Sequence, residues 1–231
     1  MSTPTITVVF QHTVSLGVDS SALVDALQKY IDEQLAPQWA VHANLVMSGP
    51  SIPKGAWALC FADDSDQAGA LGYHELEGLV PCGFVFVRSA ASAGVSVSET
   101  ASHELAELLL DPAANLAALS PRGHLVAREI CDPVQGPTIT VNGLPMADFV
   151  LPSWYGAGSA PYDLTGACQQ PWEVLPGGYV PVWDGLTWTQ LFGSHDAKLA
   201  FQKRGGGDPL RRTERRSRPP HDHDGESRLR L

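Results

Sequence analysis

The chain has 231 residues, 44% of them hydrophobic, and a formal net charge of −10 at pH 7. This length and apolar content are typical of one folded domain of about 200 residues with a substantial core. No run of about 18 apolar residues occurs, and residues 1–5 lack a basic segment followed by an apolar one. We therefore expect a soluble protein, cytoplasmic or otherwise not exported, without a membrane partner.

Charge is unevenly divided along the chain. Residues 203–231 hold nine of the 15 basic residues but only five of the 25 acidic ones, which leaves six basic and 20 acidic residues in 1–202. We expect 1–202 to be a single folded domain that does not bind nucleic acid, because an acidic surface repels phosphate. Residues 203–231 are rich in glycine and proline and poor in apolar residues, which predicts a disordered basic tail. The tail arginines could touch nucleic acid or an acidic surface, but a solvated tail is the preferred interpretation.

The N-terminal half predicts alternating strands and helices. Residues 5–10 are β-branched and typical of a strand, and residues 20–34 carry apolar side chains at helical spacing. Further strands are expected at 41–47 and 56–61. This order favours a parallel β-α-β start to a mixed sheet.

Two more strands are expected before the next helix, at residues 71–74 and 83–87. The first of them is a candidate edge strand. It contains His74, which could lie near a cleft, although a single histidine in a strand is more often a packing or surface residue.

Residues 102–107 read Ser-His-Glu-Leu-Ala-Glu and differ at one position from the His-Glu-x-x-His signature of zinc peptidases. Glu107 stands where the second histidine belongs. Four residues advance a helix by about 400° and about 6 Å, so His103 and Glu107 can converge on one ion. Glu104 then points to one side, as a general base should.

The flanking residues predict where this helix begins and ends. Ser96 and Glu99 form a capping box at its start, and leucines after His103 supply an apolar stripe. The pair Asp111-Pro112 should end it, since the residue before a proline is disfavoured in the helical conformation. We expect Asp111 to cap the following turn and not to bind an ion.

Two further carboxylates follow in the segment Arg-Glu-Ile-Cys-Asp-Pro at 128–133. Glu129 lies 22 positions after Glu107, and Asp132 comes three residues later. Glu129 is the preferred third ligand, with Asp132 in a supporting or alternative role. Cys131 lies between them, and its thiolate could reach a metal. In an extended segment, however, only one pair, Glu129/Cys131 or Ile130/Asp132, would face the site.

This combination of motifs resembles two groups of proteins. Glutamate-zincin metallopeptidases use a glutamate downstream of the signature helix as third ligand, followed by a supporting aspartate. Plant exordium-like (phosphate-induced) proteins and many uncharacterised bacterial and phage proteins share His-Glu-Leu-Ala-Glu followed by Glu-Ile-x-Asp. The resemblance covers roughly residues 95–180. It implies an α+β, zincin-like fold with a mixed sheet and metal helix in 1–112 and a loop-rich subdomain in 113–202.

The resemblance also implies a metal site and an activity. The ligands would be His103, Glu107, Glu129 and Asp132, and the cofactor one divalent metal, with zinc first and manganese or calcium as alternatives for so oxygen-rich a set. The activity would be that of a metallopeptidase that hydrolyses a peptide or protein substrate, with Glu104 as general base. A second carboxylate ligand neutralises more of the ion's charge, which weakens its acidification of water.

Two tyrosines are candidate substrate-binding residues, and two functions other than peptide hydrolysis are also considered. Tyr155 and Tyr162 are flanked by glycine and proline and are candidates for substrate contact or for hydrogen bonding to an oxyanion. The alternative function is a catalytically degenerate, metal-stabilised binding or accessory module, which could be phage-associated. A structural or packaging role, in which the signature helix is only core, is the third hypothesis.

Overall fold

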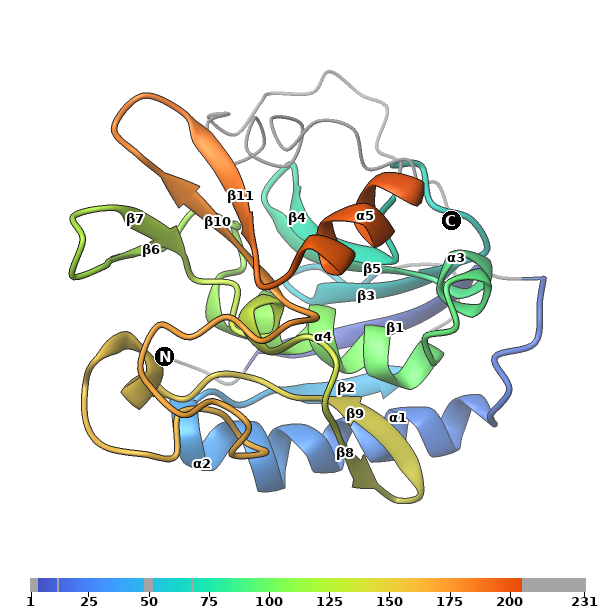
Figure 1. Cartoon of the computed structure of the whole chain (residues 1–231). Helices are drawn as coiled ribbons and strands as arrows, with labels where there is room; N and C mark the ends of the chain where they lie inside the picture. The colour runs from blue at the N-terminus through green and yellow to red at the C-terminus, as the bar shows by residue number, and fades with distance from the viewer. Residues whose placement is uncertain (1–3, 12, 48–51, 68, 205–231) are drawn as a thin grey trace.

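The computed structural model describes residues 4–11, 13–47, 52–67 and 69–204 (Figure 1). All five strands expected before the signature helix are present, within a few residues of their predicted bounds. The elements of this half are β1 (Thr5–Gln11), α1 (Ser20–Tyr30), a π-helical turn (Ile31–Leu35), α2 (Ala36–Trp39), β2 (Asn44–Met47), β3 (Trp57–Ala62), β4 (Gly72–Glu77), β5 (Val80–Phe86), α3 (Val87–Ser92) and α4 (Val97–Leu110).

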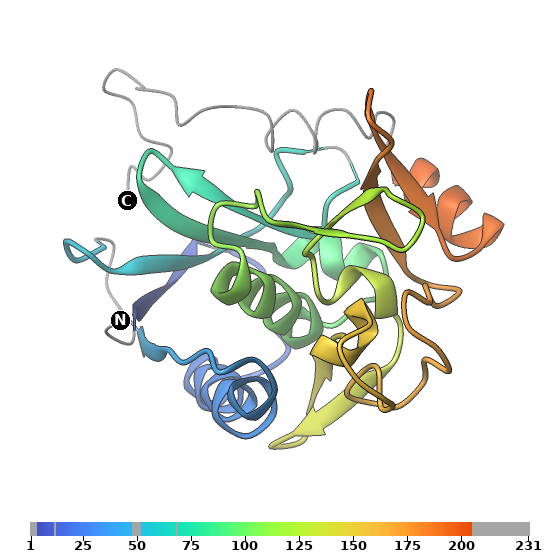
Figure 2. The ribbon, with the colours of Figure 1, turned by 90° about the vertical axis from the view of Figure 1, so that its left-hand side faces the viewer.

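The main sheet has five strands in the order β2-β1-β3-β5-β4. β1 pairs parallel with β2 and with β3, and β3 pairs parallel with β5, which confirms the expected parallel β-α-β start. β4 pairs antiparallel with β5 and lies at the edge, as expected for that segment. Helices α1 and α4 lie side by side against the same face of the sheet (Figure 2).

Helix α4 has the caps that its sequence predicts. The Ser96 hydroxyl accepts a hydrogen bond from the Glu99 backbone N–H at 3.1 Å. At the other end, the Asp111 carboxylate accepts from the N–H groups of Asn115 and Leu116, at 2.9 and 2.7 Å. Asp111 therefore caps the next turn, and this fixes where the chain leaves the helix.

The C-terminal half contains more regular structure than its prolines and glycines predict. A four-stranded antiparallel sheet has the order β11-β10-β7-β6, and β8 and β9 form a separate hairpin. The elements are β6 (Ala117–Leu119), β7 (Leu125–Ala127), a 3₁₀ turn (Asp132–Val134), β8 (Thr138–Val141), β9 (Leu144–Ala147), a second 3₁₀ turn (Pro152–Tyr155), β10 (Tyr179–Trp183), β11 (Trp188–Phe192) and α5 (His195–Lys203).

The protein is thus a mixed α+β fold with a five-stranded mixed sheet and a smaller antiparallel sheet. None of the helices within the described ranges is long and apolar enough to cross a membrane. Apart from Lys203 and Arg204, the predicted basic tail lies outside the described residues.

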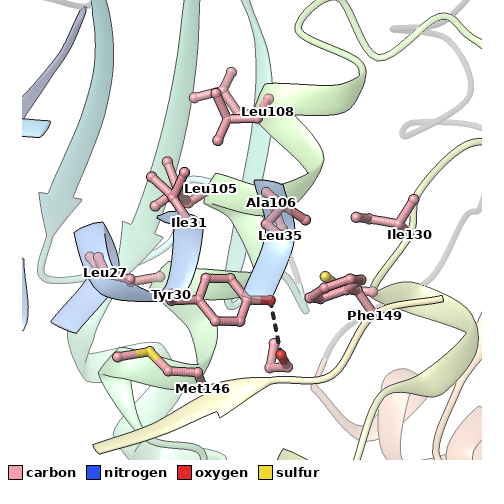
Figure 3. Packing of buried hydrophobic residues seen from close by; sticks show 14 of the residues in the cluster. Leu27, Tyr30, Ile31, Leu35, Leu105, Ala106, Leu108, Ile130, Met146 and Phe149 are labelled. Atoms are coloured by element: carbon pink, nitrogen blue, oxygen red, sulfur yellow. Dashed lines mark hydrogen bonds between the residues drawn. The ribbon is translucent and has the colours of Figure 1, made fainter. Parts of the chain in front are cut away.

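One hydrophobic core joins the two halves of the chain. Leu105 and Leu108 of α4 are fully buried in it, against side chains of α1 and of the segment after β9 (Figure 3). The Tyr30 hydroxyl donates a buried hydrogen bond of 2.9 Å to the Ala147 carbonyl, and its ring meets that of Phe149 edge-on at 6.0 Å. This packing holds the inner face of α4 and leaves its other side to the polar cluster described below.

We expect Tyr30→Phe to lower the free energy of unfolding by about 1 to 2 kcal/mol, because it removes a buried hydrogen bond and leaves packing nearly unchanged. Urea unfolding followed by fluorescence measures this effect. An unchanged unfolding midpoint would show that the hydroxyl contributes nothing to the contact between the two halves.

A pair of buried carboxyl groups anchors the loop around the second 3₁₀ turn. The Thr165 hydroxyl lies 2.6 Å from Asp148 Oδ2 and 2.8 Å from Asp163 Oδ2, and it has only one proton to donate. Burial and the neighbouring Asp163 raise the pKa of Asp148 to about 7. The pKa of Asp163 is lowered: burial opposes this, but hydrogen bonds from Asp148 and from the backbone of Cys168 and Ala167 outweigh it. Near neutral pH the pair therefore tends to keep one proton, on Asp148.

This pair predicts a pH dependence of stability. A carboxyl group whose pKa is raised by folding stabilises the fold fully below its unfolded pKa of 3.8, and that contribution is lost as the pH rises through about 7. We expect the free energy of unfolding to fall between about pH 4 and pH 8, and Asp148→Asn, which stays neutral, to show a smaller fall than wild type. Glu107, whose pKa is also raised to about 7, contributes in the same range in both proteins. Urea titrations across that range compare the two. An equal decline in the variant would assign the effect to other groups.

Candidate metal centre

Three polar side chains of α4 project from its side towards β4 and towards residues 129–132. Glu104 and Glu107 are buried, with relative exposures of 3% and 1%, and the His103 side chain is 12% exposed. The helical spacing that predicted a shared face for His103 and Glu107 holds, since His103 Nε2 lies 3.4 Å from Glu107 Oε1.

Asp132 completes a group of three around His103. Its Oδ1 lies 3.2 Å from His103 Nε2, and His103, Glu107 and Asp132 each offer a ligand atom within 4.8 Å of the others. The spacing argument preferred Glu129 as third ligand, but the described geometry groups Asp132 with His103. This first triad can hold a metal ion.

The segment that carries Asp132 is not extended where alternation was expected. Cys131 has a right-handed helical backbone conformation and precedes the 3₁₀ turn at 132–134. The N–H groups of Cys131 and Asp132 donate to Glu107 Oε1 at 3.1 and 3.3 Å. Because the chain turns here, Glu129 and Asp132 both reach the cluster, and the alternation of an extended segment does not apply.

His74 of the edge strand β4 lies inside the cluster, although its sequence context predicted a packing or surface role. Its Nδ1 is 3.8 Å from Glu104 Oε2 and 3.9 Å from Glu107 Oε2, and its Nε2 is 3.7 Å from Glu129 Oε2. His74, Glu107 and Glu129 form a second triad with ligand atoms within 4.8 Å of one another. The sequence feature that could have identified His74 is its position on the strand expected to run beside the metal helix.

Gly72 allows β4 to approach α4 closely. A Cβ atom at this position would lie 2.6 Å from Glu104 Cγ and 2.7 Å from the Phe84 carbonyl oxygen, both too short for a real contact. Gly72 and His74 are two residues apart in the strand and so face the same side. The absence of a side chain at 72 thus gives Glu104 its place beside His74.

The cluster contains more acidic than basic side chains, and burial together with these charges shifts their pKa values. Burial raises the pKa of Glu107 to about 7, although His103 opposes this. Burial lowers the pKa of both histidines, but the surrounding carboxylates outweigh it: the pKa of His74 rises to about 9 and that of His103 well above its ordinary value. Without a metal, this cluster therefore retains protons that compensate its carboxylates.

The donor atoms suit a divalent cation. Ligands about 2.0 to 2.2 Å from a tetrahedral ion are about 3.3 to 3.6 Å apart. His103 Nε2 lies at similar distances, 3.4 and 3.2 Å, from Glu107 Oε1 and Asp132 Oδ1. Glu104 Oε2 is buried and has no hydrogen-bond partner among the described residues. A buried carboxylate oxygen in this condition is costly unless a cation or a water molecule compensates it.

The two candidate tyrosines differ in their relation to this cluster. The Tyr155 hydroxyl is buried without a hydrogen-bond partner in the described part of the chain, and burial, together with the charges of Glu129 and Glu107, raises its pKa. Tyr162 packs against the hydrophobic core, and no described contact places its hydroxyl at the cluster. Tyr155 is thus the stronger candidate for a role in the site.

Neither a protein-family model, nor a curated protein, nor a solved structure matches this chain. The functional conclusion therefore depends on the geometry of the cluster itself.

Proposed function

We propose that this protein is a metal-dependent peptidase of the zincin type, with an ion held by His103, Glu107 and Asp132. The proposal is supported chiefly by the first triad, which lies beside a buried glutamate whose Oε2 makes no hydrogen bond within the described residues. Zinc suits one imidazole and two carboxylates, and manganese or calcium would suit the oxygen-rich set. When bound, the ion supplies Lewis-acid polarisation of a carbonyl group and a lowered pKa for water.

The residues of the chain supply the other parts of peptide hydrolysis. Glu104 accepts a proton from the attacking water and then donates it to the leaving amine. The Tyr155 hydroxyl donates a hydrogen bond to the oxyanion that develops on the carbonyl. β4 is the edge strand beside the cluster, so an extended peptide can pair with it in the manner of an added strand.

The low solvent exposure of the cluster supports a second function, that of a metal-stabilised binding or accessory module. Its carboxylate and imidazole side chains are at most 12% exposed, and His74 of the edge strand occupies its centre. A substrate needs space that β4 or His74 must vacate. A metal-stabilised binding or accessory module, which holds its ion without catalysis, needs no such movement.

A combined metal and activity measurement tests the first proposal. Purified protein is supplied separately with zinc, manganese and calcium, and a mixed peptide library is incubated with each sample and analysed by mass spectrometry. We expect cleavage in at least one sample and its loss in His103→Ala, together with loss of the bound ion. Metal binding without any cleavage would favour the accessory module, and equal metal content in both proteins would exclude the site.

A further inference from the structure

The two triads share one residue, Glu107, and they use its two carboxylate oxygens separately. Glu107 Oε1 is the oxygen near His103, and Glu107 Oε2 is the oxygen near His74. We propose that the cluster binds two divalent ions, with the second held by His74, Glu107 and Glu129, and with Glu107 bridging the pair. Only the first ion, held by His103, Glu107 and Asp132, rests on the proposed function.

The surroundings of His74 fix which of its ring nitrogens can bind a cation. Nε2 lies 3.0 Å from the Asp111 carbonyl oxygen, which can only accept, so Nε2 carries the hydrogen. In a neutral imidazole Nδ1 then has the free lone pair and faces Glu104 and Glu107, whereas Glu129 Oε2 lies nearest the other nitrogen, 3.7 Å from Nε2. A histidine that donates one N–H to a backbone carbonyl and turns its other nitrogen to carboxylates has the usual arrangement of a metal ligand.

The buried carboxylate of Glu104 is an independent observation that supports a cation site beside His74. Its side chain is 4% exposed, and its Oε2 has no hydrogen-bond partner in the described part of the chain. The same oxygen lies 3.8 Å from His74 Nδ1, too far for a hydrogen bond but suitable for two groups on opposite sides of an ion. An ion near His74 would give this oxygen a compensating charge.

The balance of charge favours two ions over one. Glu104, Glu107, Glu129 and Asp132 are all buried, and the two histidines are neutral when they bind metal. One divalent ion leaves two negative charges that protons must compensate, whereas two ions balance all four carboxylates without protons. Carboxylate-bridged pairs in two-metal enzymes place the ions about 3.5 to 4 Å apart, a spacing that the two oxygens of Glu107 can bridge. The neighbouring Asp111 is already stabilised by two backbone N–H groups.

Metal stoichiometry of the full chain tests the proposal. Manganese is titrated by calorimetry, the bound metal is measured by elemental analysis, and the electron paramagnetic resonance spectrum reports whether the ions are coupled. We expect about two ions and a coupled spectrum for wild type, and one ion with an uncoupled spectrum for His74→Ala, for Glu129→Gln and for His103→Ala. Glu129→Gln preserves size, so it provides the answer if His74→Ala does not fold, which circular dichroism shows.

Two controls exclude adventitious binding. His124→Ala removes an exposed histidine and should retain two ions. Replacement of both His221 and His223 by alanine tests whether the histidines at the end of the chain account for an ion, and it should also leave two.

The outcomes separate this inference from the proposed function. One ion in wild type, unchanged by His74→Ala and lost in His103→Ala, would overturn the second site and leave the proposed function intact. Loss of an ion on replacing His221 and His223 would also overturn it. No bound ion in any sample would overturn both.

Discussion

Glu104→Gln is expected to reduce peptide hydrolysis by about 10²- to 10⁴-fold, the usual contribution of a positioned general base. Glutamine has nearly the same size, so the close packing of residue 104 against Gly72 is kept. The amide cannot accept the proton of the attacking water. Because residue 104 is not one of the ligands of the first triad, the ion held by His103, Glu107 and Asp132 should be retained. Initial rates on the best peptide from the library provide the measurement.

Two variants control for indirect effects. Glu99→Gln makes the same chemical change on the same helix, at a half-buried position outside both triads, and should retain activity. Glu107→His restores the two-histidine signature and leaves the ion more positive, so zinc affinity and hydrolysis should rise where the pocket accepts the ring. If wild type and Glu107→His both bind metal and neither exceeds the rate of Glu104→Gln, the peptidase proposal fails and the accessory module remains.

The predictable parts of the site are those that depend on local geometry. The face shared by His103 and Glu107 follows from helical spacing alone, and the caps at Ser96 and Asp111 follow from side chains that bond to backbone groups a few residues away. The β-branched strands of the first half and their parallel order were predictable for the same reason. Short-range periodicity and capping rules contain this information.

The parts that could not be predicted depend on contacts between distant segments. His74 enters the cluster because β4 pairs antiparallel with β5 and Gly72 lets it approach α4. Its place on a candidate edge strand allowed a position near a cleft, but the local sequence does not specify its contacts with Glu104, Glu107 and Glu129. The choice between Glu129 and Asp132 depends on a turn at Cys131 that Glu107 stabilises from 24 residues away. The smaller sheet was missed because its strands are short, three to five residues, and interrupted by loops.

Removal of bound metal by a chelator is expected to lower the melting temperature of the protein by about 8 to 16 °C. An ion present at about 1,000 times its dissociation constant stabilises the native state by about 4 kcal/mol, and each kcal/mol corresponds to about 2 to 4 °C for a chain of this size. The physical cause is the group of four buried carboxylates that includes Glu107, because bound metal offsets negative charge that the metal-free protein must offset with protons. Differential scanning calorimetry with and without the chelator measures the shift.

The variant that distinguishes specific loss of the ion from a general effect of the chelator is Asp132→Asn combined with His103→Ala, which removes two ligands of the first triad. This protein should melt at a lower temperature than metal-loaded wild type, and the chelator should shift its melting much less. An exposed-site control, His124→Ala, should respond to the chelator as wild type does. A wild-type protein that loses its metal and melts at the same temperature would contradict the cluster as the site of the ion. An ion that the folded cluster binds in preference to the unfolded chain must stabilise the native state.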